Sequence, residues 1–123
     1  MENSLGGAAM ENVIEQKSFR FAVRIVKLCS YLRKSKREAV LSNQLMRCGT
    51  SIGANVAEAQ QAQSRADFVS KLNIALKEAS ETKYWLRLLK ETKYLTDTEF
   101  SSIYPDVVEL EKLLTSIILS TTK

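Results

Sequence analysis

Two glutamates one helical turn apart, Glu78 and Glu81, come nearest in this 123-residue chain to a catalytic or metal-binding pair. Side chains three residues apart share one face of a helix, where two carboxylates can act together on a proton or a metal ion. A di-iron bundle also needs a Glu-x-x-His motif, and the sequence contains no histidine. The pair is therefore interpreted as a solvated or interface-facing acidic patch.

The two cysteines, Cys29 and Cys48, do not form a metal site either. A structural zinc site needs about four ligands at short, regular spacing. Both cysteines fall on apolar helix faces, where a free thiol packs as a small hydrophobic group; a disulfide between them is the minor alternative. Without histidine or a ligand cluster, we expect no catalytic residue, no cofactor and no metal. The chain is predicted not to be an enzyme.

The segment Gln44–Ala59 has helical apolar spacing, but it carries no charge from Cys48 to Ala57. Gly49-Thr-Ser-Ile-Gly53 lacks the lysine and the preceding strand of a phosphate-binding loop. A helix without a charged face is usually buried on several sides. Each mid-helix glycine costs about 0.8–1 kcal/mol relative to alanine, which close packing must offset. We expect this helix to contact another subunit as well as its own core.

The same segment carries a polar stripe, in which Arg47, Ser51, Asn55 and Glu58 follow one another at helical spacing. Arg47 and Glu58 are too far apart along one helix to pair, so each needs a partner elsewhere. We interpret the stripe as a hydrogen-bonded network between helices or subunits, with a small polar ligand site as the alternative. The predicted packing or oligomer residues are Arg47, Gly49, Ser51, Gly53, Asn55, Glu58 and Trp85.

Positive charge is concentrated in the first half of the chain. Residues 1–62 hold nine Lys/Arg against five Asp/Glu, whereas residues 63–123 hold nine of each. At about 100° per residue the basic side chains of the first helix share one arc. Such a stripe can contact phosphates while an aromatic ring stacks on a base, although a solvated helix face is the alternative. The predicted nucleic-acid-binding residues are Lys17, Arg20, Arg24, Lys27, Tyr31 and Lys34.

The elements that carry these residues are predicted to be four amphipathic helices in one domain at residues 11–121, after a flexible leader at residues 1–10. The first helix spans about 11–33 and places Val26 on its core side. Capping boxes at Ser35/Glu38 and Thr96/Glu99 begin the second and fourth helices, and a weaker start signal at Ser64/Asp67 begins the third. We expect Pro105 to kink or restart the fourth helix.

Short links between such helices predict an all-α, antiparallel up-down-up-down bundle. No apolar run approaches the ~18 residues that a membrane span requires, and the N-terminus has no signal-peptide pattern, so we expect a cytoplasmic protein with no membrane partner.

Several residue blocks, in order along the chain, resemble one bacterial family of four-helix-bundle proteins. That family includes proteins encoded in intervening sequences of 23S ribosomal RNA genes and is related to the accessory variability protein of diversity-generating retroelements. The resemblance covers about Ile14 to Leu119. The blocks are Gln44-Leu-Met-Arg47, Gly49-Thr-Ser-Ile-Gly-Ala-Asn55 with Glu58-Ala59, Ser64, Asp67-Phe68, Ala75-Leu-Lys-Glu-Ala-Ser-Glu-Thr82 and Tyr84-Trp85-Leu86.

The resemblance implies a ring-shaped homo-oligomer, with a pentamer favoured, in which five copies would carry a formal charge of about +20. The retroelement relative implies RNA or DNA, and a reverse transcriptase, as partners. This chain has Asn55-Val-Ala-Glu-Ala59 where many relatives have Asn-Ile-Ala-Glu-Gly, and Lys77-Glu78 where they have Gly-Ser, which places it in a different branch. The family offers no catalytic residues. The alternative function is a protein-interaction scaffold without nucleic-acid contact.

Overall fold

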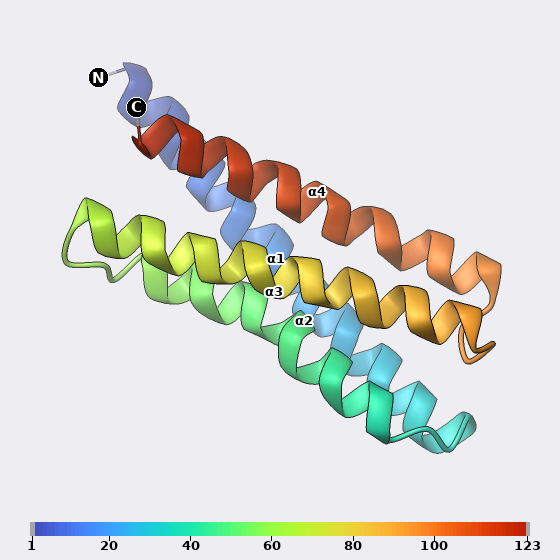
Figure 1. The fold of residues 1–123 in the computed structure, drawn as a ribbon. Coiled ribbons are helices and arrows are strands. Elements are labelled where there is room, and N and C mark those ends of the chain that lie inside the picture. Colours follow the sequence, from blue (N-terminus) through green and yellow to red (C-terminus); the bar gives the residue numbers. More distant parts are fainter. Residues whose placement is uncertain (1, 123) are drawn as a thin grey trace.

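The computed structural model describes the backbone of residues 2–122 and the side chains of residues 12–122. Four helices make up this part of the chain, and it contains no strand: α1 (Glu2–Ser35), α2 (Val40–Ala59), α3 (Arg65–Glu91) and α4 (Asp97–Thr122). Each helix packs against the next one, α4 also packs against α1, and the two termini lie at the same end of the bundle (Figure 1). The all-α, four-helix prediction is confirmed.

Two of the three predicted helix starts are confirmed by side-chain hydrogen bonds. The Ser64 hydroxyl accepts from the Asp67 N–H at 3.0 Å and caps α3. At the start of α4 the box is reciprocal: the Glu99 N–H donates to the Thr96 hydroxyl at 3.1 Å, and the Thr96 N–H donates to the Glu99 carboxylate at 2.9 Å. These bonds satisfy backbone donors that have no partner within the helix.

The start of α2 differs from the sequence prediction. Ser35 is the last residue of α1 rather than a cap, and the chain turns through a positive φ of 53° at Arg37. Glu38 then caps α2 alone, because its carboxylate accepts from the N–H groups of Leu41 and Ser42, both at 2.8 Å. A carboxylate near a helix N-terminus is also stabilised by the helix dipole.

Helix α1 begins at Glu2, well before the predicted start near Glu11. The predicted leader at residues 1–10 therefore overlaps backbone that is helical from Glu2. Its flexibility stays a prediction, because residue 1 and the side chains of residues 2–11 lie outside the described part of the chain.

The core consists of the predicted apolar stripes, including Ile25 of α1, Ile52 of α2, Leu86 of α3 and Leu114 of α4, all fully buried. Val26 is an exception: it was expected in the core, but it is 46% exposed. It lies one residue past Ile25 and so points about 100° away from the buried face. Helix α4 runs through Pro105 without restarting.

Gly49 and Gly53 both face α1 of the same chain. A Cβ atom on Gly53 would lie 3.1 Å from the backbone oxygen of Ser18, and one on Gly49 would lie 2.8 Å from Ile25 Cγ1. The two glycines therefore allow a close crossing of α1 and α2 within the bundle. In residues 2–122, moreover, no helix combines the length and apolar character required to span a bilayer.

Candidate functional site

Two members of the predicted basic stripe are held by α4. Lys17 Nζ lies 2.8 Å from a carboxylate oxygen of Glu109. The Arg24 guanidinium contacts three acceptors: the Asp106 carboxylate at 2.6 Å, the Ser102 carbonyl at 3.0 Å and the Ser102 hydroxyl at 2.8 Å. Each cation is thus partly neutralised within the chain, which makes it a weaker contact for a phosphate.

The contacts of Arg24 lie beside Pro105. Proline supplies no N–H to the preceding turn and crowds the carbonyl groups there. The carbonyl that loses its helical donor is that of Ser101, four residues before Pro105, whereas the guanidinium of Arg24 donates to the neighbouring carbonyl of Ser102. No pattern in the sequence showed that α1 would face Ser102 and Asp106.

The rest of the stripe stays open to solvent. Arg20, Lys27 and Lys34 are exposed, and among the described side chains none of the three forms an ion pair. We call these three residues the basic row. They recur every seven residues, which places successive cations about 10.5 Å apart along one line of α1. Tyr31, 36% exposed, lies between the last two.

The polar stripe of α2 faces α3, where its charged members find their partners. Arg47 forms ion pairs with both Glu78, at 3.0 Å, and Glu81. The indole N–H of Trp85 donates to the same Glu81 carboxylate at 3.1 Å. The Arg47 guanidinium therefore joins the carboxylates of Glu78 and Glu81 within one chain, which is typical of a structural network.

The other members of this stripe are satisfied nearby. Glu58 pairs with Lys71 of α3 at 3.2 Å, the Ser51 hydroxyl donates to the Arg47 carbonyl, and the Asn55 amide donates to the Ser51 carbonyl. Within the chain, Arg47 and Glu58 thus join α2 to α3, whereas Ser51 and Asn55 bond only to carbonyl groups of α2 itself. Contact of these residues, and of Gly49, Gly53 and Trp85, with a second subunit stays a prediction.

Cys29 and Cys48 are free thiols, both buried. Burial raises the pKa of each thiol from 9.0 to about 11, since a thiolate loses its hydration in the core. Cys29 Sγ donates to the Ser42 carbonyl at 3.3 Å. Among the described side chains, no group of three or more Cys, Asp or Glu residues is placed to hold a metal ion.

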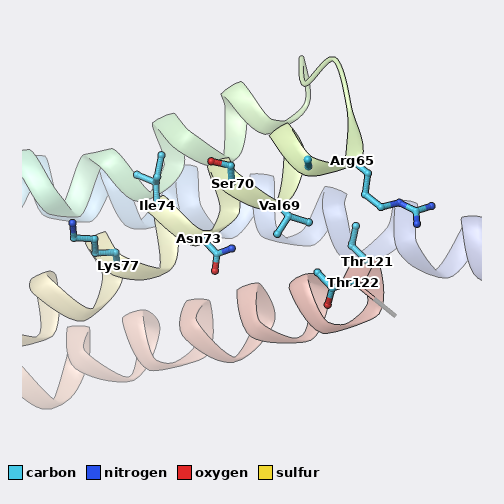
Figure 2. Close-up of a pocket in the computed structure, with 9 residues that line it drawn as sticks. Arg65, Val69, Ser70, Asn73, Ile74, Lys77, Thr121 and Thr122 are labelled. Atoms are coloured by element: carbon cyan, nitrogen blue, oxygen red, sulfur yellow. The ribbon is translucent and has the colours of Figure 1, made fainter.

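A groove of about 910 Å³ separates the start of α3 from the end of α4. Figure 2 shows Val69 and Asn73 of α3 directed toward the last turn of α4, where Thr121 and Thr122 lie. Lys77 is at one end of the groove, and Arg65 extends away from the other. Among the described side chains that line this groove there is no carboxylate and no thiol.

Comparison with known proteins identifies relatives of this chain. Residues 10–116 match the family model of the 23S rRNA-intervening sequence protein. The chain is also similar to a crystal structure of a protein of unknown function from the S23 ribosomal protein family of Bacteroides thetaiotaomicron, with 57% identity and a TM-score of 0.89. That match covers 89% of this chain and 98% of the other. No curated protein matches. The chain therefore belongs to the 23S rRNA-intervening sequence protein family.

Proposed function

We propose that this protein is a non-enzymatic, cytoplasmic nucleic-acid-binding accessory protein that acts as a ring-shaped homo-oligomer, with a pentamer favoured. The observation that carries the proposal is the basic row, in which three exposed cations of α1 have no acidic partner among the described side chains. A line of unpaired cations attracts a polyanion because binding releases condensed counterions. The family's association with ribosomal RNA genes agrees with RNA as the polyanion.

An antiparallel up-down-up-down topology is supported by the order of the interhelical ion pairs. Lys17 pairs with Glu109, whereas Arg24, farther along α1, pairs with Asp106, earlier in α4. Likewise Arg47 pairs with Glu78 and Glu81, whereas Glu58 pairs with Lys71. Contacts that move in opposite directions along two neighbouring helices are typical of antiparallel packing.

Self-assembly is supported by an apolar row on the free surface of α1, made of Phe19, Val23 and Val26, with Phe19 68% exposed. Their spacing of four and then three residues is the spacing by which one helix packs along another. The row runs beside the basic row. In a ring, the apolar row of one copy would pack against a different surface of the next copy, so each copy would add one basic row to the assembly.

Wild-type protein is expected to show a solution mass several times its chain mass of 13.9 kDa, and Phe19→Ser is expected to shift the assembly toward monomer. Burying a phenylalanine in an interface stabilises the assembly by about 1.5–3 kcal/mol. The Phe19→Ser variant should therefore dissociate at a protein concentration roughly tenfold or more above that at which wild type dissociates. Light scattering over a dilution series measures both. Leu119→Ser, at a 60% exposed position on α4, is the matched control and should leave the mass unchanged. A wild-type monomer at micromolar concentration would refute the assembly.

Reversing the basic row with Arg20→Glu, Lys27→Glu and Lys34→Glu is expected to raise the Kd for RNA or DNA by about 100-fold or more near 0.1 M salt. The slope of log K against log salt should also become shallower, by about 2–3, because fewer counterions are released. Fluorescence anisotropy with labelled duplex and single-stranded oligonucleotides gives both quantities.

The matched control reverses three other exposed cations without an ion-pair partner among the described side chains: Arg65, Lys77 and Lys112. This variant has the same net charge as the row variant, so a general charge effect would weaken both equally. Equal affinities for the two variants, or no wild-type binding at low salt, would reject the nucleic-acid function. Nuclease-resistant capture of a protein from the native host would then favour the scaffold alternative, with a reverse transcriptase as one such partner.

A further inference from the structure

A second groove lies between the last turns of α3 and the first turns of α4, at the end of the bundle away from the termini (Figure 1). Its volume is about 390 Å³. The side chains that matter are Tyr84, Arg87, Lys90 and Glu91 from α3, and Phe100 and Tyr104 from α4. Three aromatic rings and two cations around a small groove are an unusual concentration in a chain with only 7% aromatic residues.

The aromatic rings are arranged as a floor and a rim. Phe100 and Tyr104, one turn apart on α4, stack with ring centroids 4.6 Å apart and an interplanar angle of 27°. Both are partly buried against the core. Tyr84, across the groove on α3, is 56% exposed and meets Trp85 edge to face at 5.1 Å. The Tyr84 ring therefore has surface open for another flat ring.

The cations are placed beside these rings. Lys90 Nζ lies 4.8 Å from the centroid of Phe100. Arg87 is exposed, has no ion-pair partner among the described side chains, and is one helical turn from Tyr84. Among the described residues of the lining, Glu91 is the one acidic residue, so two cations face one anion. An anionic group at this position would be favoured.

We propose that this groove binds an unpaired nucleobase together with its phosphate, the base stacking on Tyr84 and the phosphate lying against Arg87 and Lys90. Stacking on an aromatic side chain suits any base, because every base has a π face. The volume falls within the range of small-ligand sites. A duplex does not fit this chemistry, since its bases are already stacked in pairs. The site is on α3 and α4, so it does not depend on the basic row of α1.

Trp85 provides a direct measurement, because it is the single tryptophan of the chain and its ring touches Tyr84. Titration of the full chain with AMP, with UMP and with a ten-nucleotide single-stranded oligo(U) is expected to change Trp85 emission and to saturate. Measured in the basic-row variant, oligo(U) binding at least tenfold tighter than UMP identifies single-stranded nucleic acid as the source of the base, and equal or weaker binding identifies the free nucleotide. No change with any of these probes overturns the proposal.

Substitutions at the rim separate this site from the basic row. Tyr84→Ala should weaken oligo(U) binding about 5- to 150-fold, whereas Tyr84→Phe, which keeps the ring, should stay within about threefold of wild type. Arg87→Gln should weaken mononucleotide and oligo(U) binding together. None of the three should alter the affinity for a ten-base-pair duplex.

The basic-row variant should give the opposite pattern, with duplex affinity lost and mononucleotide affinity kept. A loss of binding at the groove can therefore be told apart from a loss of binding at the basic row, because the other site still binds its own probe. Wild-type affinity of Tyr84→Ala for both oligo(U) and mononucleotides would show that the aromatic groove is only a packing feature of the α3–α4 turn.

Discussion

Replacing Gly49 with leucine is expected to lower the free energy of unfolding by about 3 kcal/mol or more, because α1 and α2 can no longer approach to their native distance. Already the first added carbon, a Cβ atom, would lie 2.8 Å from Cγ1 and 3.0 Å from Cγ2 of Ile25. Ile25 is fully buried, so it has no free space into which to move. Either its rotamer or the helix crossing must change, and both disturb the core.

Urea unfolding followed by circular dichroism measures this effect. Ala54→Leu is the matched control: the residue is exposed on the same helix, so its substitution should change stability by less than about 0.5 kcal/mol. A double-mutant cycle locates the clash, since Ile25→Ala removes the atoms that a new Cβ would meet. Gly49→Ala should therefore be less costly in the Ile25→Ala background than alone. Wild-type stability of Gly49→Leu would contradict the close crossing.

Both thiols are expected to react with a thiol reagent at pH 8 at least about 100-fold more slowly in the native protein than in urea. The thiolate is the reactive form, and burial raises the pKa of Cys29 and of Cys48 from 9.0 to about 11, which reduces the thiolate fraction in proportion. Absorbance of the released chromophore gives the two rates. Fast labelling of either thiol without denaturant would contradict the burial of that thiol in the native protein.

The same raised pKa values make stability depend on alkaline pH. Below pH 9 both thiols are neutral in the folded and unfolded states, so their full contribution to the stability of the fold is present. As the pH rises from 9 through about 11, the unfolded chain loses these protons first, and stability falls by up to roughly 2–3 kcal/mol per thiol. The double variant Cys29→Ala, Cys48→Ala removes this part of the loss. Between pH 8 and pH 10.5, the urea midpoint of wild type should therefore fall by more than the urea midpoint of the double variant.

Helix starts were predictable where the cap is local. Thr96 and Glu99, and Ser64 and Asp67, bond to backbone groups within four residues, so short sequence patterns contain all the atoms involved. Ser35 and Glu38 have the same pattern but a different outcome. The chain instead extends α1 through Ser35 and uses the carboxylate of Glu38 alone to cap α2.

The basic stripe shows the limit of a helical projection. Angles along one helix predict that Lys17, Arg20, Arg24, Lys27 and Lys34 share one side of α1, and none of the five is buried. They contained no information about what that side meets. The structure divides the stripe, because α4 presents Glu109 and Asp106 to two of its members and leaves the basic row open.

The number of helices, most of each apolar face and the family could be predicted from the sequence, because these depend on periodic spacing and on residues near one another in the chain. Which polar residues meet depends instead on how the helices pack against one another. Arg47 was expected to need a distant partner, and its position between Glu78 and Glu81 follows from the alignment of α2 with α3. The glycines of α2 needed a neighbour that comes close, and the neighbour is α1 of the same chain. The aromatic groove likewise joins residues from two helices, because pairings across helices depend on three-dimensional packing that spacing along one helix does not contain.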